Sequence, residues 1–249
     1  MAARAAIVTG AGTGIGAAVS RELAGEGVAV ALVGRRADPL ERVADEIVNR
    51  GGSAIVVTAD LSETASAPRI VEAAQRAFGR LDILVNNAAV LTTRPFEAVP
   101  VEELDEHIAT NLRAPFLLTQ AALGALRRSG AGSVVNISST AATTVRREQS
   151  VYGMTKAALE YLTRSLAAEL APQVRVNAIA PGPTNTPILS MWCGTTEEAW
   201  EWLAPQTPLG RIAAPEEIAW WVARLCDPRG AYATGAVIAV DGGFALDFQ

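Results

Sequence analysis

The chain is poor in the residues on which several common kinds of site depend. Its 249 residues include two cysteines, Cys193 and Cys226, and a single histidine, His107. The cysteines form no CxxC pair and lack zinc-ligand spacing, which indicates unpaired thiols and no metal site. A serine hydrolase needs G-x-S-x-G and a histidine late in the chain; the first is missing, and His107 precedes the central serines. Because Glu and Asp surround His107, we interpret it as an exposed or paired surface residue.

Long apolar runs and basic clusters are missing as well. The longest uncharged stretch, 176–196, contains three prolines and two asparagines and is unsuited to span a bilayer. The first residues lack the apolar segment of a signal peptide. A net charge of −5 argues against a nucleic-acid surface. We therefore expect a soluble, cytoplasmic protein that binds neither membranes nor nucleic acid.

What the chain does contain is a regular alternation of two patterns. Short β-branched apolar runs predict strands at 5–9, 28–33, 54–58, 81–86, 133–138, 174–179 and 237–240. Amphipathic stretches predict helices at 15–27, 39–50, 65–78, 101–128, 151–170 and 215–226. The alternation predicts an α/β fold: a doubly wound, Rossmann-type parallel sheet of about seven strands with helices on both faces. No linker divides the chain, so we expect one domain over 1–249, with an irregular substrate loop or lid at about 183–214.

The first predicted strand runs into a glycine-rich turn, Thr9-Gly10-Ala11-Gly12-Thr13-Gly14-Ile15-Gly16, and then into a helix. Gly10 permits a tight turn, Gly14 permits a pyrophosphate to approach the helix N-terminus, and Gly16 permits close helix–strand packing. The spacing is not the G-x-G-x-x-G of the dinucleotide fingerprint, so a purely structural turn is the alternative.

The second predicted strand ends in Arg35 and Arg36, where an acid would bind the ribose 2′-hydroxyl of NAD. Two guanidinium groups without a carboxylate favour a 2′-phosphate, and so favour NADP while leaving NAD open. The alternative is that both arginines are solvated or that one pairs with Asp38.

Tyr152 and Lys156 lie four residues apart, so on a helix they share a face. A neighbouring cation favours the phenolate and is expected to lower the pKa of the tyrosine toward the working range. Alone, such a pair is more often a surface tyrosine beside a solvated lysine.

The pair does not occur alone. Other motifs accompany it in order: Thr9 to Gly16, Asn86-Asn87-Ala88, Asn111, Ser139, Tyr152 with Lys156, Pro181-Gly182, and Val240-Asp241-Gly242-Gly243. Together they resemble the single-domain branch of the short-chain dehydrogenase/reductase family, essentially from end to end. Two positions depart from that family's pattern: Ala89 replaces a glycine, and Thr184 replaces an aliphatic residue.

The resemblance implies a catalytic set. Tyr152 would be the general acid in carbonyl reduction and the base in alcohol oxidation. Lys156 would hold the nicotinamide ribose and lower the tyrosine pKa, and Ser139 would hydrogen-bond the substrate oxygen. Ser138 is less favoured, because alternation along the strand points it the other way.

Asn111 completes that set, in a proton relay from Lys156 through water. Pro115, four residues later, has no N–H group. The Asn111 carbonyl therefore loses its helical partner, so a kink is predicted there, and the freed carbonyl can hold a water molecule. The alternative is that Pro115 only bends the helix around the core.

The implied cofactor site is formed by Gly10, Thr13, Gly14, Ile15, Gly16, Arg35, Arg36, Asp60, Leu61, Asn87, Ala88, Tyr152, Lys156, Pro181, Gly182, Thr184 and Thr186. Asp60 would contact the adenine, Asn87 and Ala88 the adenosine side, and Thr186 the nicotinamide carboxamide.

For the substrate, the predicted lid is apolar and aromatic and includes Trp192, which suggests a bulky hydrophobic or cyclic carbonyl compound. Packing of these residues on the core or on another subunit is an equal alternative. Gln149, three residues before the tyrosine, can hydrogen-bond a substrate. Arg146 and Arg147 can attract a carboxylate or a phosphopantetheine, but a solvated loop is the favoured interpretation of the two arginines. A 3-oxoacyl-thioester reductase and a non-catalytic dinucleotide-binding protein are the alternative functions. The family also implies a homotetramer, with a dimer as the fallback.

Overall fold

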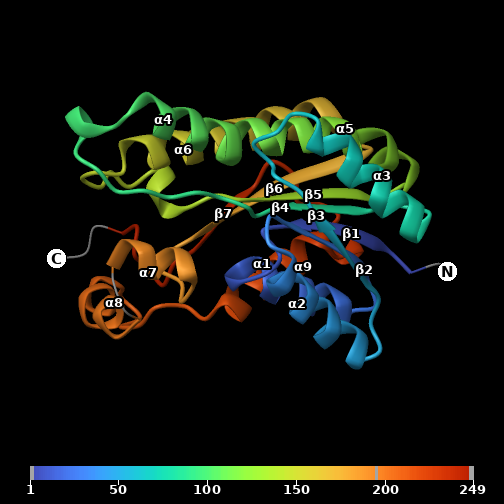
Figure 1. Ribbon diagram of the computed structural model, residues 1–249, viewed down its shortest axis with the longest axis horizontal. Coiled ribbons are helices and arrows are strands. Elements are labelled where there is room, and N and C mark those ends of the chain that lie inside the picture. The colour runs from blue at the N-terminus through green and yellow to red at the C-terminus, as the bar shows by residue number, and fades with distance from the viewer. Residues whose placement is uncertain (1–2, 194–195, 247–249) are drawn as a thin grey trace.

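A computed structural model describes residues 3–193 and 196–246 of the protein (Figure 1). All seven predicted strands are present: β1 Ala5–Thr9, β2 Ala29–Gly34, β3 Ala54–Thr58, β4 Ile83–Asn86, β5 Gly132–Ile137, β6 Val174–Pro181 and β7 Val237–Val240. They pair in parallel in the order β3-β2-β1-β4-β5-β6-β7. The predicted Rossmann-type sheet is confirmed.

Helices cover both faces of the sheet (Figure 1). One layer holds α1 Gly14–Gly25, α2 Ala37–Asn49 and α9 Pro215–Cys226, and the other holds α3 Ser66–Phe78, α4 Val101–Ile108, α5 Ala114–Arg128 and α6 Ser150–Leu170. Successive side chains of a strand point to opposite faces. In β1, Ala6 and Val8 accordingly pack in one core cluster, while Ile7 packs in the other. Burial on both faces explains why the strands are continuously apolar.

The sheet order fixes where a site can form. The chain winds outward from β1 through β2 to β3, returns to β4 beside β1, and then winds the other way. The loops after β1 and β4 therefore diverge and leave a crevice at the carboxyl ends of the strands, where ligands bind in such folds.

The long predicted helix over 101–128 is interrupted. Between α4 and α5 lies a π-helical turn, η2 Ala109–Arg113, in which the Ala114 N–H group bonds to the Ala109 carbonyl, five residues back. The helix is therefore interrupted where the sequence predicts a kink, by a π turn next to Pro115 in the first turn of α5.

The prediction that His107 is exposed is wrong. His107 lies in α4 and is fully buried. Its Nδ1 donates to the Glu103 carbonyl at 2.8 Å, and its Nε2 lies 3.5 Å from the Thr92 hydroxyl. The imidazole is buried because α4 packs its inner face on the loop that follows β4.

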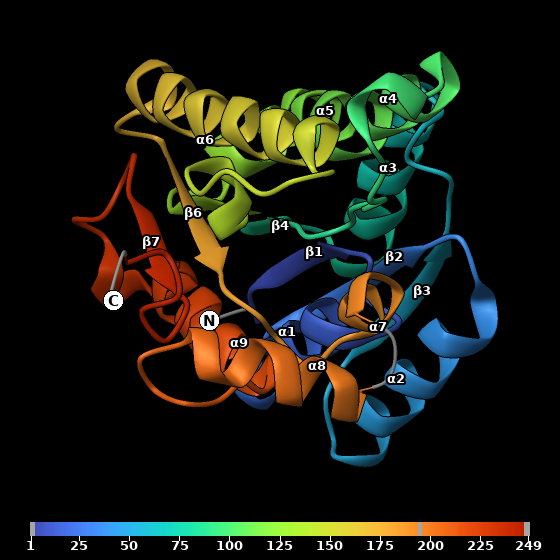
Figure 2. The ribbon, with the colours of Figure 1, turned by 90° about the vertical axis from the view of Figure 1, so that its left-hand side faces the viewer.

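The predicted irregular loop at about 183–214 contains two short helices, α7 Pro187–Cys193 and α8 Thr196–Leu203, which lie beyond one end of the sheet (Figures 1 and 2). Four short 3₁₀ turns also form: η1 Phe96–Ala98, η3 Thr140–Ala142, η4 Ala204–Gln206 and η5 Pro228–Gly230. Within the described residues, none of the helices combines the length and apolar character that crossing a membrane requires.

Candidate active site

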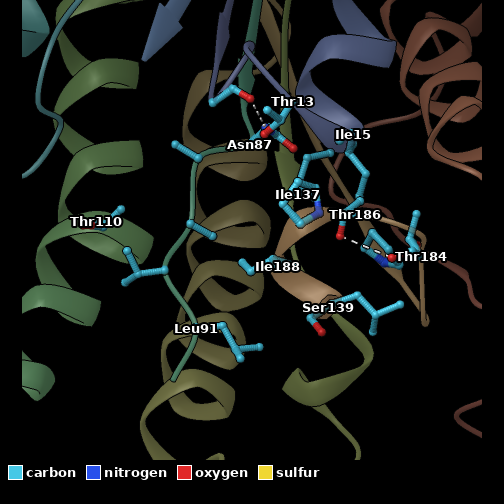
Figure 3. Close-up of a pocket in the computed structure, with 18 of the residues that line it drawn as sticks. Thr13, Ile15, Asn87, Leu91, Thr110, Ile137, Ser139, Thr184, Thr186 and Ile188 are labelled. Atoms are coloured by element: carbon cyan, nitrogen blue, oxygen red, sulfur yellow. Dashed lines mark hydrogen bonds between the residues drawn. The ribbon is translucent and has the colours of Figure 1, made fainter. Parts of the chain in front are cut away.

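A cavity of about 410 Å³ opens at the carboxyl ends of six strands, β1 to β6. Loops that are far apart in sequence meet in it, including the turn after β1 and the segments after β4 and β6 (Figure 3). Of the predicted site residues, it brings together Gly10, Thr13, Gly14, Ile15, Arg35, Arg36, Asp60, Leu61, Asn87, Ala88, Ser139, Gln149, Tyr152, Lys156, Pro181, Gly182, Thr184 and Thr186. Gly16 and Asn111 do not line it.

The glycine turn has the conformation and the space that its sequence predicts. Gly10 and Gly14 have φ angles of 63° and 53°, in the left-handed region that glycine adopts without strain. A Cβ atom on Gly16 would lie 2.3 Å from the Gly10 carbonyl oxygen, so only glycine lets α1 pack this closely. Thr13 occupies the N-cap of α1 without a side-chain cap, which leaves backbone N–H groups for a ligand. This cradle suits a pyrophosphate.

Asn87 fixes that turn from the neighbouring strand. Its Nδ2 donates to the carbonyls of Thr9 and Gly10, at 2.8 and 3.3 Å. The Thr9 hydroxyl accepts from the backbone N–H groups of Asn87 and Ala88, at 2.9 and 3.0 Å. Asn87 therefore shapes the cradle as well as bordering it (Figure 3).

At the far end of the cavity, Arg35 and Arg36 are exposed, and no ion pair with either forms among the residues that the structure describes. The predicted alternative of pairing with Asp38 therefore does not occur. Asp60 faces the same end, and its Oδ1 accepts from the Ser62 hydroxyl at 2.7 Å and the Ser62 N–H at 2.8 Å. These bonds, with a smaller contribution from Arg35, hold the pKa of Asp60 below its usual value.

Tyr152 and Lys156 lie on α6 at the other end of the cavity, and both are buried. The Lys156 Nζ donates to the Ile137 carbonyl at 2.8 Å and lies 5.6 Å from the centre of the tyrosine ring. Burial raises the pKa of Tyr152 to about 12, and hydrogen bonding with Ser139 only partly offsets it. Burial also lowers the pKa of Lys156 to about 8. The expected lowering of the tyrosine pKa by its lysine neighbour is therefore wrong for the protein alone, because burial raises the pKa and only the Ser139 hydrogen bond acts the other way.

The two serines after β5 differ as the strand alternation predicts. The Ser138 hydroxyl donates to the Glu160 carboxylate at 2.9 Å, so it is committed to α6. The Ser139 oxygen accepts the Ala141 N–H at 3.1 Å and also hydrogen-bonds with Tyr152. Both residues border the cavity, but Ser139 is the one beside the tyrosine hydroxyl.

Asn111 is buried behind the cavity wall. Its Oδ1 accepts the Val90 N–H and its Nδ2 donates to the Val90 carbonyl, both at 2.9 Å. Nδ2 also donates to the Thr155 hydroxyl at 3.2 Å. The side chain therefore joins the loop after β4 to the helix that carries Tyr152 and Lys156, a role that the sequence does not reveal.

The loop after β6 closes the nicotinamide side of the predicted site. Its Gly182 lies so close to the next strand that a Cβ atom would be 2.7 Å from the Asp241 Cα. Thr184 donates its hydroxyl to the Gly182 carbonyl at 3.0 Å, and Thr186 donates to the Thr184 carbonyl at 3.2 Å (Figure 3). Thr186 also lies over Gly14, where a Cβ atom would be 3.0 Å from its methyl group.

Between this loop and the segment after β4 the cavity is mostly apolar. Val90, Leu91, Ile188, Leu189 and Phe244 line it there together with Arg146. Ile188 and Leu189 belong to the predicted apolar lid, whereas Phe244 follows the Val240-Asp241-Gly242-Gly243 motif and was not predicted as a site residue. Trp192, predicted to contact substrate, lies in α7, but its side chain falls outside the described part of the chain.

Comparisons with known proteins agree with this geometry. Residues 10–245 match the family model described as Enoyl-(Acyl carrier protein) reductase. The chain is 38% identical over 246 residues to the A-factor type gamma-butyrolactone 1′-reductase (1S-forming) of Streptomyces virginiae, covering 98% of this chain and 96% of that protein.

Two solved structures are also similar over nearly the whole chain. One, provisionally described as an NAD(P) dependent gluconate 5-dehydrogenase from Beutenbergia cavernae with NADP bound at low occupancy, has a TM-score of 0.91 at 38% identity and covers 98% of this chain and 97% of its own. The other, 3-ketoacyl-(acyl-carrier-protein) reductase from Brucella melitensis complexed with NADH, has a TM-score of 0.89 at 34% identity over 98% of each chain. The chain therefore belongs to the short-chain dehydrogenase/reductase family, whose members are NAD(P)-binding oxidoreductases acting on alcohol and carbonyl groups.

Proposed function

We propose that the protein interconverts a ketone and a secondary alcohol with NADP, on a bulky and largely apolar substrate. The observation that carries the proposal is the convergence of Ser139, Tyr152 and Lys156 at one end of a cavity whose other end is a glycine cradle with two exposed arginines. In this proposal residues 1–249 act as one NAD(P)-binding domain, with about 183–214 as the lid over the substrate.

The residues divide the chemistry between them. The nicotinamide cofactor supplies the hydride in reduction and accepts it in oxidation. Ser139 orients the substrate carbonyl oxygen, and Tyr152 donates the proton that this oxygen takes up. With a pKa of about 12, Tyr152 is a neutral phenol at neutral pH and carries the proton that reduction requires.

We assign Lys156 and Asn111 to the relay that returns a proton to Tyr152. Lys156 holds the cofactor ribose with a cation that burial makes easier to deprotonate. Because Pro115 has no N–H group, the Asn111 carbonyl has no helical partner four residues on and can hold a relay water.

The experiment that tests the proposal follows NADPH oxidation, with NADH in parallel, against cyclic ketones, acyl thioesters and keto sugars. Turnover of cyclic ketones that is lost in Tyr152→Phe, and retained in the control Tyr161→Phe, supports it. Tyr161 lies on the same helix but is exposed and outside the cavity. A Tyr152→Phe variant with full activity refutes the role of the tyrosine, and cofactor binding without turnover of any ketone favours the non-catalytic alternative.

Cofactor choice is tested separately, at Arg35. We expect Arg35→Asp to weaken NADPH binding about 10- to 100-fold, because a charge-assisted contact to the 2′-phosphate is replaced by repulsion. NADH binding should be unchanged or tighter, because an acid at this position can bind the free ribose 2′-hydroxyl. Fluorescence titration of the two cofactors measures both affinities.

The matched control is Arg42→Asp, which makes the same change in charge at an exposed position of α2 outside the cavity. An Arg35→Asp variant that keeps its preference between the two cofactors would show that the arginine does not select NADP.

A 3-oxoacyl-thioester reductase is the second candidate. The similarity to the 3-ketoacyl-(acyl-carrier-protein) reductase from Brucella melitensis favours it. It requires a route for an extended phosphopantetheine arm, so acyl thioesters in the panel decide between the two candidates.

A further inference from the structure

The substrate end of the cavity carries two polar side chains that the proposed proton transfer does not use. They are Arg146 and Gln149, in the loop just before α6. The Gln149 N–H bonds to the Arg146 carbonyl at 3.4 Å, so the two residues close one turn and face the same cavity. A second backbone bond, from the Arg94 N–H to the Glu148 carbonyl at 2.9 Å, ties this turn to the segment after β4.

Gln149 presents an amide to the cavity. Its residue is only 5% exposed. Among the residues that the structure describes, no hydrogen bond to its side-chain amide is found. The amide is not among the buried polar atoms that lack a partner, so it is open to the cavity that Gln149 lines. An amide placed at the cavity surface in this way is available to a ligand oxygen.

Arg146 presents a cation on the same wall. Its Cζ lies 4.1 Å from the centre of the Phe244 ring. Phe244 is buried in a small apolar cluster with Leu189, Leu203 and Ile212, so the stacked guanidinium has a rigid support. Stacking on a ring occupies a face of the guanidinium and is compatible with hydrogen bonds from its N–H edge.

Among the described residues that line the cavity, the charged side chains at the substrate end are basic. Asp60 is the only acidic residue among those described that line the cavity, and it lies at the adenosine end with Arg35. The substrate end contains Arg146 and Lys156.

We propose that Arg146 and Gln149 form a subsite for a carboxylate carried by the substrate, away from the carbonyl that is reduced. The substrate class is then a compact, largely apolar keto or hydroxy acid. This inference rests on the proposed function for the reaction, but the binding of a carboxylate does not depend on turnover.

The test compares matched ligands on the enzyme–NADPH complex. Calorimetric titration with cyclohexanecarboxylate and cyclohexanecarboxamide measures binding, and 4-oxocyclohexanecarboxylate and its methyl ester measure turnover. We expect the acids to be favoured about 10-fold or more in affinity and in kcat/KM, because a charged group gains more from the guanidinium. Arg146→Gln should remove that preference, mainly through KM, and leave the ester within about twofold. Arg146→Lys should restore part of it.

Arg147→Gln is the control, since Arg147 is exposed and does not line the cavity. Equal binding of acid and amide by the unaltered protein, binding of neither, or an Arg146→Gln variant that keeps the preference overturns the subsite. Carboxylate binding without any turnover keeps the subsite and overturns the reaction. Turnover of neutral ketones with no preference for acids keeps the proposed reaction and overturns the subsite.

Discussion

Lys156 is buried at the wall of the cavity, and it is the only lysine in the chain; the other 20 basic residues are arginines. The distinction matters because a buried lysine can change its protonation state near neutral pH, whereas arginine stays charged. Its pKa of about 8 lies below the unfolded value of 10.5. Between these values the unfolded chain binds more protons, so this group makes the free energy of unfolding rise with pH across that window.

A single lysine makes the predicted pKa directly measurable. In protein labelled with ¹³C-lysine, one set of side-chain signals is expected, and its chemical shift should titrate with a midpoint near pH 8. Bound NADPH should raise that midpoint, because its phosphates and ribose favour the charged form. A midpoint near 10.5 in the free protein would contradict the burial argument, and the unfolded protein in urea provides the reference value.

Residue spacing predicted which groups would meet, but not their electrostatics. The i, i+4 spacing correctly placed Tyr152 and Lys156 on one helix face. It carried no information on burial, and burial reverses the expected direction of the tyrosine pKa shift. Phe244 shows the same limit, because only the folded chain brings the segment after β7 to the cavity.

Among the elements, the interrupted helix between α4 and α5 shows how a local break is stabilised by tertiary contacts. Pro115 predicted a break from the sequence, but the π turn depends on partners that are distant in sequence. Asn111 in that turn bonds to both backbone groups of Val90 and to Thr155. Asn111→Leu would therefore remove this link as well as disturb the proposed relay, so loss of turnover in that variant alone does not separate the two roles.

The segment after β4 has a second support, centred on Glu103 of α4. One carboxylate oxygen accepts the Thr92 hydroxyl at 2.6 Å, and the other accepts Arg94 Nε at 3.0 Å. The bond from Thr92, then that from Arg94, holds the pKa of Glu103 below its usual value. The backbone N–H group of Arg94 also donates to the Glu148 carbonyl. Through Arg94, Glu103 therefore supports both the segment after β4 and the loop before α6, which form two walls of the substrate end of the cavity.

We expect Glu103→Gln to raise KM for the substrate about 3- to 10-fold while the dissociation constant for NADPH stays unchanged, since the weakened brace supports only the substrate walls. It should also lower the free energy of unfolding by about 1 kcal/mol. Steady-state kinetics and urea unfolding measure the two effects. Glu102→Gln, at an exposed position of the same helix turn, is the control and should change neither. Equal losses in KM and NADPH affinity would indicate a general loss of structure instead.

For the whole molecule, the period of the apolar pattern predicted seven strands and both helical layers, with boundaries displaced by one or two residues. Long elements with one consistent pattern are predictable because burial selects their residues. The order of the strands was not predicted, because it depends on pairing between segments that are far apart in the sequence. Helices α7 and α8 were missed because each spans about two turns, too few for a period to show, and proline and threonine there indicated a loop.

Exposed apolar side chains on one helical layer bear on the oligomeric state of the protein. On the outer side of α6, Met154 and Tyr161 are 47% and 74% exposed and lie two helical turns apart, and Phe116 on α5 is 45% exposed. Figure 2 shows α4, α5 and α6 in one layer, so we propose that this layer pairs with its copy in a homotetramer. Light scattering should give four times the mass of one chain. Tyr161→Glu should reduce it, because a buried unpaired carboxylate is costly at an interface. Val48→Glu, at an exposed position of α2 in the opposite layer, should leave the mass unchanged. A protein that is monomeric at micromolar concentration would contradict both the tetramer and the dimer.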